Sequence, residues 1–271
     1  MSDIVLSSGV RSNLLQLQQT SDLITQTQTR LATGKRVNSA LDNPINYFTA
    51  QGLTVRANDL NSLLDSMSTG INTIQAANNG ITAITKLVQS AQSLVSQAQQ
   101  TADTNVRATL ASQFDSLLGQ IDQLAGDSGI NGVNLLNGND LTITLNETGQ
   151  STVTVTGVTD TAAGDLAIAN STNSWASASD VSAAATDLTA SLVTLRSQSQ
   201  ALSSNLQTVQ IRQDFTKAMI NTLQTGSDNL TLADSNEEGA NLLALQTRQQ
   251  LSTTALSLAA QADQNVLRLF Q

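Results

Sequence analysis

The feature of this sequence that most constrains its fold is an apolar repeat of seven residues that starts at Leu53 and runs for six further repeats. The repeat positions are Leu53, Leu60, Met67, Ile74, Ile81, Val88 and Val95, and companions three residues on include Leu63, Ala77, Ile84, Ala91 and Ala98. This spacing is typical of a coiled-coil seam. It predicts one helix from Pro44 to Gln100, about 85 Å long at 1.5 Å per residue, with Asn43 as its N-cap. Gly70 and Gly80 are expected to weaken that helix locally.

A second long apolar pattern occupies the C-terminal half. Its members are Val181, Ala185, Leu188, Leu192, Leu195, Leu202, Leu206, Val209, Ile220 and Leu223. They predict a helix of about 70 Å over residues 179–227, capped by Ser177 or Ser179. A compact globule of 271 residues is less than about 50 Å across. The sequence therefore predicts a mainly α fold: an elongated rod of long antiparallel coiled-coil-like helices, in which the N- and C-terminal segments pair.

A shorter helix is predicted to begin at Asp103 or Thr104 and to end with Gly126 at its C′ position. Its apolar face holds Leu110, Phe114, Leu117, Ile121 and Leu124. Both chain ends are also periodic, through Val10, Leu14, Leu17, Ile24 and Leu31 at one end and Leu251, Ala255, Leu258, Ala262, Val266 and Leu269 at the other. These terminal stripes are thin, and isolated helices of this kind are marginal without a partner surface.

The middle of the chain breaks the helical pattern. Eight of the 15 glycines lie between Gly119 and Gly164. Residues 141–145 and 153–156 alternate apolar and polar side chains on either side of a turn-like stretch, which predicts a β-hairpin. The segment from Asp160 to Ser179 is expected to be a loop anchored by Trp175.

Charge and composition exclude several classes of protein. The net charge is −9, and the interval between Arg107 and Arg196 holds nine acidic residues and no Lys or Arg. The two ends of the chain are therefore neutral and the centre is acidic, which argues against nucleic-acid binding. The sequence has no Cys and no His, so thiolate zinc sites, disulfides and the usual catalytic triads are excluded.

No motif predicts an enzyme or a cofactor site. The acidic group formed by Asp228, Asp234, Glu237 and Glu238 lacks the alternating ligands and glycine turn of an EF-hand and is expected to cap or be solvated. Residues 137–140 are expected to form a turn. We predict no catalytic, metal or cofactor-binding residues. The first residues lack a basic, apolar signal segment and no run of about 18 apolar residues occurs, so the chain is expected to stay cytoplasmic or to be exported without a cleavable signal peptide.

Six blocks of the sequence are distinctive: residues 30–43 (RLATGKRVNSALDN), 50–53 (AQGL), 70–75 (GINTIQ), 130–136 (INGVNLL), 237–248 (EEGANLLALQTR) and 264–269 (QNVLRL). In this order they resemble the sequence of bacterial flagellin. The resemblance covers roughly residues 1–140 and 178–271. It implies a subunit that polymerises with itself into the extracellular flagellar filament used for motility.

The resemblance also implies an arrangement of layers and a set of partners. The terminal arms would form an inner coiled-coil layer, unordered in the free subunit, and the long helices would form the next layer. This divides the chain into an N-terminal arm (1–43), N-terminal rod helices (44–126), an outward-facing centre (127–177), a C-terminal rod helix (178–228) and a C-terminal arm (229–271). The implied partners are the export apparatus and chaperone, the filament cap and the hook–filament junction proteins, with no nucleic acid and no membrane insertion.

Two sets of packing residues follow from the stripes and the resemblance. Contacts between subunits are expected at Val10, Leu14, Leu17, Ile24, Leu31, Leu251, Leu258, Val266 and Leu269. The core of the rod is expected at Leu53, Leu60, Met67, Ile74, Ile81, Val88, Leu188, Leu195, Leu202 and Val209.

The sequence departs from the flagellin pattern in two places. Only about 50 residues (127–177) separate the helical halves, so large outer domains are expected to be absent. The region that many flagellins present to Toll-like receptor 5 has Gln89, Gln92 and Gln113 where charged residues are usual in the family. Amides make weaker hydrogen bonds than charged groups, so weak or no activation of that receptor is expected.

Two alternatives stay open at this point. A hook–filament junction protein shares the helical ends of flagellin, and an unrelated secreted coiled-coil adhesin or needle-type subunit would share the periodicity. The second alternative predicts fully helical arms in the free subunit.

Overall fold

The computed structural model describes residues 8–269, with side chains described for 8–262, 264 and 265. It is mainly α, as predicted, with the helices α1 (Ser8–Thr33), α2 (Pro44–Gln100), α3 (Thr104–Asp127), α4 (Ala178–Thr231) and α5 (Ser235–Leu269). A 3₁₀ turn, η1 (Thr172–Trp175), and two strands, β1 (Leu141–Thr144) and β2 (Thr152–Val155), complete the described elements. The chain forms two compact units: a central unit from Arg56 to Asn221, and a terminal unit made of the chain up to Val55 and from Thr222 onward.

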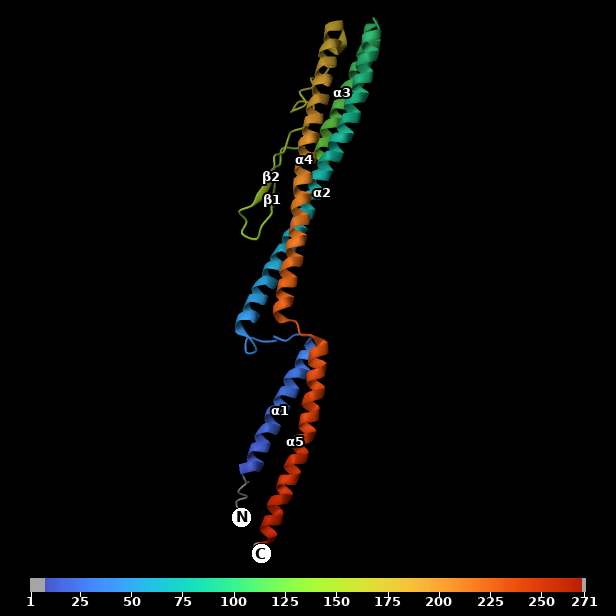
Figure 1. Ribbon diagram of the computed structural model, residues 1–271. Coiled ribbons are helices and arrows are strands. Elements are labelled where there is room, and N and C mark those ends of the chain that lie inside the picture. The colour runs from blue at the N-terminus through green and yellow to red at the C-terminus, as the bar shows by residue number, and fades with distance from the viewer. Residues whose placement is uncertain (1–7, 270–271) are drawn as a thin grey trace. The chain divides into compact units, whose positions relative to one another are not determined.

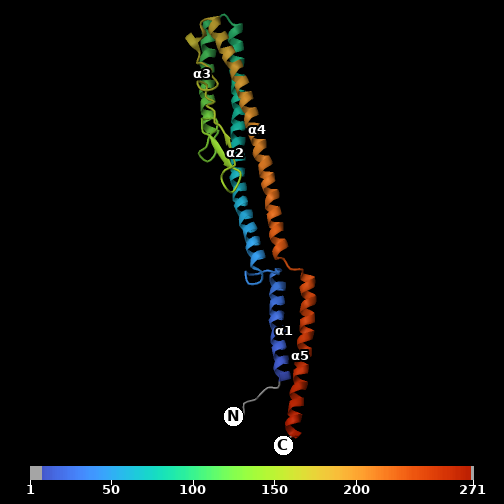
Figure 2. The ribbon, with the colours of Figure 1, turned by 60° about the vertical axis from the view of Figure 1, so that its left-hand side comes forward.

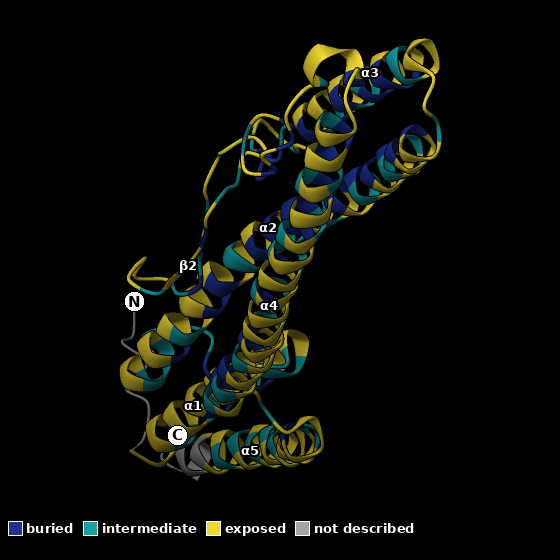
Figure 3. Cartoon of the chain, turned by 90° about the horizontal axis from the view of Figure 1, so that it is seen from above, coloured by how far each residue is buried: buried dark blue, intermediate teal, exposed yellow. Residues whose placement is uncertain are grey.

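The central unit is built on α2, α3 and α4, which lie side by side in Figures 1 and 2. The apolar positions of the repeats in α2 and α4 are buried in the central unit, and buried residues recur along both helices in Figure 3. Buried here are Leu60, Met67, Ile74, Ile81, Val88, Leu188, Leu195, Leu202 and Val209, each at most 6% exposed. Aliphatic side chains at this spacing bury a continuous seam because residues three and four apart share one helix face.

The helix starts follow their capping residues. The Asn43 Oδ1 accepts a hydrogen bond from the Asn46 N–H at 3.0 Å, and the Asp103 Oδ1 accepts from the Asn105 N–H at 2.8 Å. The Ser177 hydroxyl accepts from the Asp180 N–H at 3.3 Å. These contacts satisfy backbone donors that have no partner inside the helix. The prediction for the end of α3 is wrong: Gly126 lies inside the helix, which continues to Asp127, with Ser128 as C-cap.

The two glycines of α2 are places of close approach. The helix runs unbroken through Gly70 and Gly80. A Cβ at Gly70 would collide with the side chain of Ile143, and one at Gly80 would collide with Ser128 and Leu136. Glycine is intrinsically unfavourable inside a helix. Here the missing Cβ at each of the two positions lets side chains from residues 128–143 pack directly on the backbone of α2.

The predicted hairpin is confirmed. Strands β1 and β2 are antiparallel, with Leu141 opposite Val155 and Ile143 opposite Val153. The side chains of Ile143 and Val155 are 1% exposed, so one face of the hairpin packs inward while its threonines face solvent. This alternation follows from the two-residue period of a strand.

The segment Val158–Trp175, which we call the cover segment, follows the hairpin and packs on α3. Its Ala162 N–H donates to the Asp122 Oδ1 at 2.6 Å, and its Ser171 N–H donates to the Asp115 Oδ1 at 2.7 Å. Trp175 is fully buried, and the centroid of its ring lies 5.0 Å from the ring centroid of Phe114. The predicted Trp175 anchor is confirmed, although the end of the segment forms the 3₁₀ turn η1 where the sequence predicted only loop.

Candidate assembly surfaces

The terminal unit pairs α1 with α5 in antiparallel fashion, and the two helices run alongside each other in Figures 1 and 2. The seam of α1 consists of Val10, Asn13, Leu17, Thr20, Ile24, Thr27 and Leu31, and the inner face of α5 consists of Glu238, Leu242, Leu245, Gln249, Ser252, Leu256 and Ala259; these residues are buried or half-buried. Apolar and polar positions alternate along α1, so every second layer of the seam lacks a large apolar side chain. Only Val10, Thr20 and Thr27 of α1 are buried.

The predicted N-terminal stripe lies mostly in this seam. Val10, Leu17, Ile24 and Leu31 face α5 of the same chain, whereas Leu14 is 38% exposed. Asn13, Thr20 and Thr27 occupy the intervening seam positions, and the predicted role of Leu14 between subunits stays a prediction. For the four seam residues the structure shows packing within one chain, and their role between subunits stays a prediction.

The predicted C-terminal stripe points away from α1. Leu251 and Leu258 are 66% and 62% exposed, and Ala255 and Ala262 are exposed beside them. The side chains of Val266 and Leu269 lie outside the described residues. The helix α5 thus has two faces: a mixed polar and apolar face toward α1 and an apolar stripe without a partner in the chain. The sequence pattern revealed only the outer stripe, because Gln249 and Ser252 interrupt the inner one.

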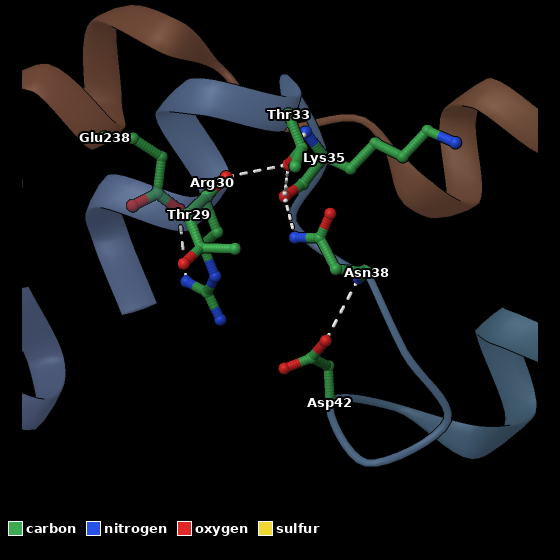
Figure 4. Close-up of polar contacts among 7 residues, drawn as sticks. All are labelled: Thr29, Arg30, Thr33, Lys35, Asn38, Asp42 and Glu238. Carbon is green, nitrogen blue, oxygen red and sulfur yellow. Dashed lines mark hydrogen bonds and ion pairs between the residues drawn. The ribbon is translucent and has the colours of Figure 1, made fainter. Parts of the chain in front are cut away.

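A network of polar contacts connects the end of α1 to the start of α5 (Figure 4). The Arg30 Nη1 lies 3.1 Å from the Glu238 Oε1, and Glu238 is buried at 6% exposure. Backbone bonds join the following segment to the end of α4: the N–H groups of Arg36 and Val37 donate to the Thr231 carbonyl at 2.7 and 3.2 Å. Residue Gly34 adopts φ +66°, a left-handed conformation that ends α1 and favours glycine. The ion pair and the backbone bonds together fix where the two arms begin.

The loop between α1 and α2 is organised by one carboxylate. The Asp42 Oδ2 accepts a hydrogen bond from the Asn38 N–H at 3.0 Å, and the Asn38 Nδ2 donates to the Lys35 carbonyl at 2.8 Å (Figure 4). The same Asp42 Oδ2 also accepts from the Ser39 N–H at 2.9 Å. The hydrogen bonds from the backbone of Ser39 and then of Asn38 lower the pKa of Asp42 below its ordinary value. Hydrogen bonding to the charged form is what favours ionisation here.

Sequence reasoning missed an apolar stripe at the start of α2 and in the loop before it. Leu41, Ile45, Phe48 and Val55 are 96%, 77%, 63% and 51% exposed. Ile45, Phe48 and Val55 lie on α2 at spacings of three and seven residues, so they share one helix face, and Leu41 lies in the loop four residues before Ile45. This spacing could be found in the sequence. The prediction for this helix instead followed the seven-residue repeat that begins at Leu53, which has a different phase. Another exposed pair, Ile211 and Phe215, lies four residues apart on the central-unit part of α4.

The other predicted site residues lie in the central unit or next to it. Nine of the ten predicted rod-core residues are buried there, and Leu53, in the terminal unit, is half-buried. Gln89 and Gln92 line a groove of about 430 Å³ between α2 and α4. Gln113 lies exposed on α3 and does not line that groove.

The acidic residues near the start of α5 act as caps and partners. The Asp234 Oδ1 accepts from the Asn236 N–H at 2.8 Å, and Glu238 pairs with Arg30. Within the described part of the chain no group of three or more His, Cys, Asp or Glu side chains is arranged to hold a metal ion. None of the described helices is both long and apolar enough to cross a bilayer.

Comparisons with known proteins point to one family. Residues 8–140 match the family model described as the bacterial flagellin N-terminal helical region. The chain is similar to flagellin FljM of Caulobacter vibrioides, with 33% identity over 100% of this chain and 99% of the relative, and to a flagellin of Brucella melitensis, with 26% identity over the full length of both. A crystal structure of Bacillus cereus flagellin aligns with 57% of this chain and 88% of that chain at 20% identity and a TM-score of 0.48.

Proposed function

Since this chain belongs to the bacterial flagellin family, we propose that its exposed apolar stripes are the surfaces on which neighbouring copies pack in a filament. The chain is a structural subunit that assembles with itself into the extracellular flagellar filament, and its family is not enzymatic. The full-length flagellin relatives favour this function over a hook–filament junction protein. The remaining question is which residues make the polymer.

The observation that carries the proposal is the apolar stripe of α5. Leu251 and Leu258, two heptad-related leucines, are each more than 60% exposed in the single chain. Apolar area that stays in water forgoes about 25 cal/mol per Å² of stabilisation, which burial against another surface would supply. A second copy of the chain supplies such a surface, because the same stripe recurs on every subunit of a homopolymer.

We further propose that the arms form the inner layer of the filament and order only on assembly. The described seam between α1 and α5 is less apolar than the seam of the central unit, since polar side chains fill every second layer of α1. Helices with such a thin apolar stripe depend on a partner surface for their stability. In the polymer, each arm pair would gain neighbours on its exposed leucines.

Limited proteolysis combined with seeded elongation tests this proposal. Purified subunit is digested with trypsin before and after elongation from filament fragments, and cleavage is followed at Arg30, Arg36 and Arg248 by mass spectrometry. We expect rapid cleavage of the free subunit, a resistant central unit, and protection of all three sites in filaments seen by electron microscopy. Arms that resist the protease in the free subunit would contradict the proposal and favour a preformed coiled coil.

The family also suggests how the subunit reaches the filament. We propose export through the flagellum without a cleavable signal peptide, assisted by a chaperone, followed by assembly under a filament cap on top of the hook–filament junction proteins. Comparing the mass of the intact filament subunit with that of the full chain, starting at Met1 or Ser2, tests the signal-peptide part. A subunit shortened by about 15 or more N-terminal residues, the length of a signal segment, would contradict it.

Weak or absent activation of Toll-like receptor 5 is the last part of the proposal. It depends on Gln89, Gln92 and Gln113, whose amides replace the charged groups expected in receptor-activating flagellins. Dose–response curves with purified monomer in receptor reporter cells test it, with a flagellin known to activate as the positive control. Strong activation by this chain would overturn the proposal.

A further inference from the structure

The side chain of Asp160, in the cover segment of the central unit, is a buried carboxylate that makes no hydrogen bond. The residue is 0% exposed, and neither carboxylate oxygen has a partner. Its backbone is held in place, because the Asp160 N–H donates to the Leu136 carbonyl at 2.9 Å. A buried ionised carboxylate without a partner is among the costliest groups in a folded protein.

The surroundings supply no positive charge. The side chain of Gln198 of α4 lies close enough to the carboxylate to oppose the rise in its pKa, and the Gln198 Oε1 is itself buried without a donor. The one charged group whose field acts on the Asp160 carboxylate is also acidic, Asp165 in the same segment. Between Arg107 and Arg196 the sequence has no basic residue, and residues 134–136 on the remaining side are uncharged. A proton is therefore the simplest group that can neutralise Asp160.

The cover segment is also the part of the chain where backbone strain is concentrated. Ala167, Asn173, Ser174 and Trp175 have φ values between 48° and 55°, a left-handed conformation that costs non-glycine residues about 1 kcal/mol or more each. This strained segment is held by hydrogen bonds to Asp115 and Asp122 of α3, by the Phe114–Trp175 ring contact, by backbone bonds and by its buried apolar side chains. A segment of this kind opens locally when one of its attachments is weakened.

We propose that Asp160 makes the attachment of the cover segment to the central unit depend on pH, closed when the carboxyl group is protonated and loosened when it is ionised. In the neutral form the carboxyl group no longer carries a buried, unpaired charge, which is the costliest part of enclosing it. Burial raises the pKa of Asp160 to about 6, and Asp165 adds to the rise. Because the folded-state pKa lies above the ordinary 3.8, the stabilisation is complete below about pH 4 and is lost as the pH rises through about 6.

Trp175 is the single tryptophan of the chain and lies in the cover segment, so its fluorescence reports on closure. The experiment measures acrylamide quenching of Trp175 in the full-length subunit between about pH 5 and pH 8. We expect the quenching constant to rise about twofold with a midpoint near pH 6 as local opening increases. Unchanged quenching across this range in the wild-type chain would overturn the proposal, whatever the variants do.

Two variants connect any transition to Asp160. Asp160→Asn stays neutral at every pH and keeps the size of the buried side chain, so its quenching is expected to stay low and flat. Asp127→Asn, which removes an exposed carboxylate at the end of α3, is the matched control and is expected to keep the wild-type midpoint. An Asp160→Asn protein that titrates like the wild type would contradict the assignment. Far-UV circular dichroism checks that both variants keep their helical content.

Discussion

The central and terminal units use the same seven-residue spacing to different effect. In the central unit, α2 and α4 place large aliphatic side chains such as Met67, Ile74 and Leu188 at the seam, and each is fully buried. In the terminal unit, α1 places threonine and asparagine at alternate seam positions, and α5 leaves Leu251 and Leu258 in solvent. The heptad thus specifies helix pairing in both units, but only in the central unit does it supply a dry core.

Because the two seams differ in apolar content, we expect the central unit to fold within one chain and the terminal unit to depend on assembly. Burying a large aliphatic side chain contributes about 1.5–3 kcal/mol, whereas a threonine in the same position contributes much less. A unit with a continuous aliphatic seam and a third helix is equipped to fold within one chain. Two helices with a half-polar seam and exposed leucines would, under the proposed assembly, gain their missing stabilisation from other chains, and their order would then depend on the polymer.

The largest expected effect comes from a charge in the central seam. Ile74→Asp buries a carboxylate at a fully enclosed position and is expected to lower the free energy of unfolding by about 4 kcal/mol or more. Gln75→Asp, one residue away and exposed, serves as control and should change it by less than about 0.5 kcal/mol. Urea unfolding followed by circular dichroism measures both. Equal small effects would mean that the seam is not the core of this unit.

The same charge on the outer stripe of α5 is expected to act on assembly alone. Leu258→Asp should abolish seeded filament elongation while changing the stability of the free subunit by less than about 0.5 kcal/mol, because the side chain is already in solvent. Ser257→Asp, one residue away, exposed and off the apolar stripe, is the matched control and should elongate normally. Normal elongation by the Leu258→Asp protein would remove the α5 stripe from the contact surface.

A smaller effect is expected where the arms begin. Glu238→Gln leaves the guanidinium of Arg30 without its charged partner and should weaken the α1–α5 pairing by about 1–3 kcal/mol. Hydrogen exchange of α1 amides in assembled filaments measures the change. Arg56→Gln breaks the exposed Arg56–Glu147 pair of the central unit, which should cost only about 0.2–1 kcal/mol. Identical effects of the two changes would show that burial of Glu238 adds nothing.

The smallest effect is confined to the loop before α2. The lowered pKa of Asp42 means that its hydrogen bonds to Asn38 and Ser39 stabilise the loop above about pH 4 and are lost as the pH falls through the lowered value. The Ser39 amide should therefore lose hydrogen-exchange protection only in acid, when its exchange rate is compared with the intrinsic rate at the same pH. An Asp42→Asn protein should show fast exchange at neutral pH as well, and protection equal to wild type would contradict this role.

Much of the fold could be predicted because it depends on local patterns. The heptads gave α2 and α4, Asn43 and Asp103 marked helix starts, and alternation gave the hairpin. The end of α3 was mispredicted because a glycine near a helix end resembles a C′ residue, while the following turn can still continue the helix. The stripe at Ile45 and Phe48 was missed because periodicity identifies an apolar face but does not say whether anything covers it.

The sequence by itself determined that this is a long-helix protein with neutral ends and an acidic centre, because spacing and charge are properties of the chain alone. The resemblance in its blocks also indicated the flagellin family before any fold was known. Only the tertiary structure decided which apolar stripes are covered within one chain, since burial depends on what lies opposite a side chain. It placed Val10 in the α1–α5 seam, left Leu258 in solvent, and enclosed Asp160 where no positive charge reaches it.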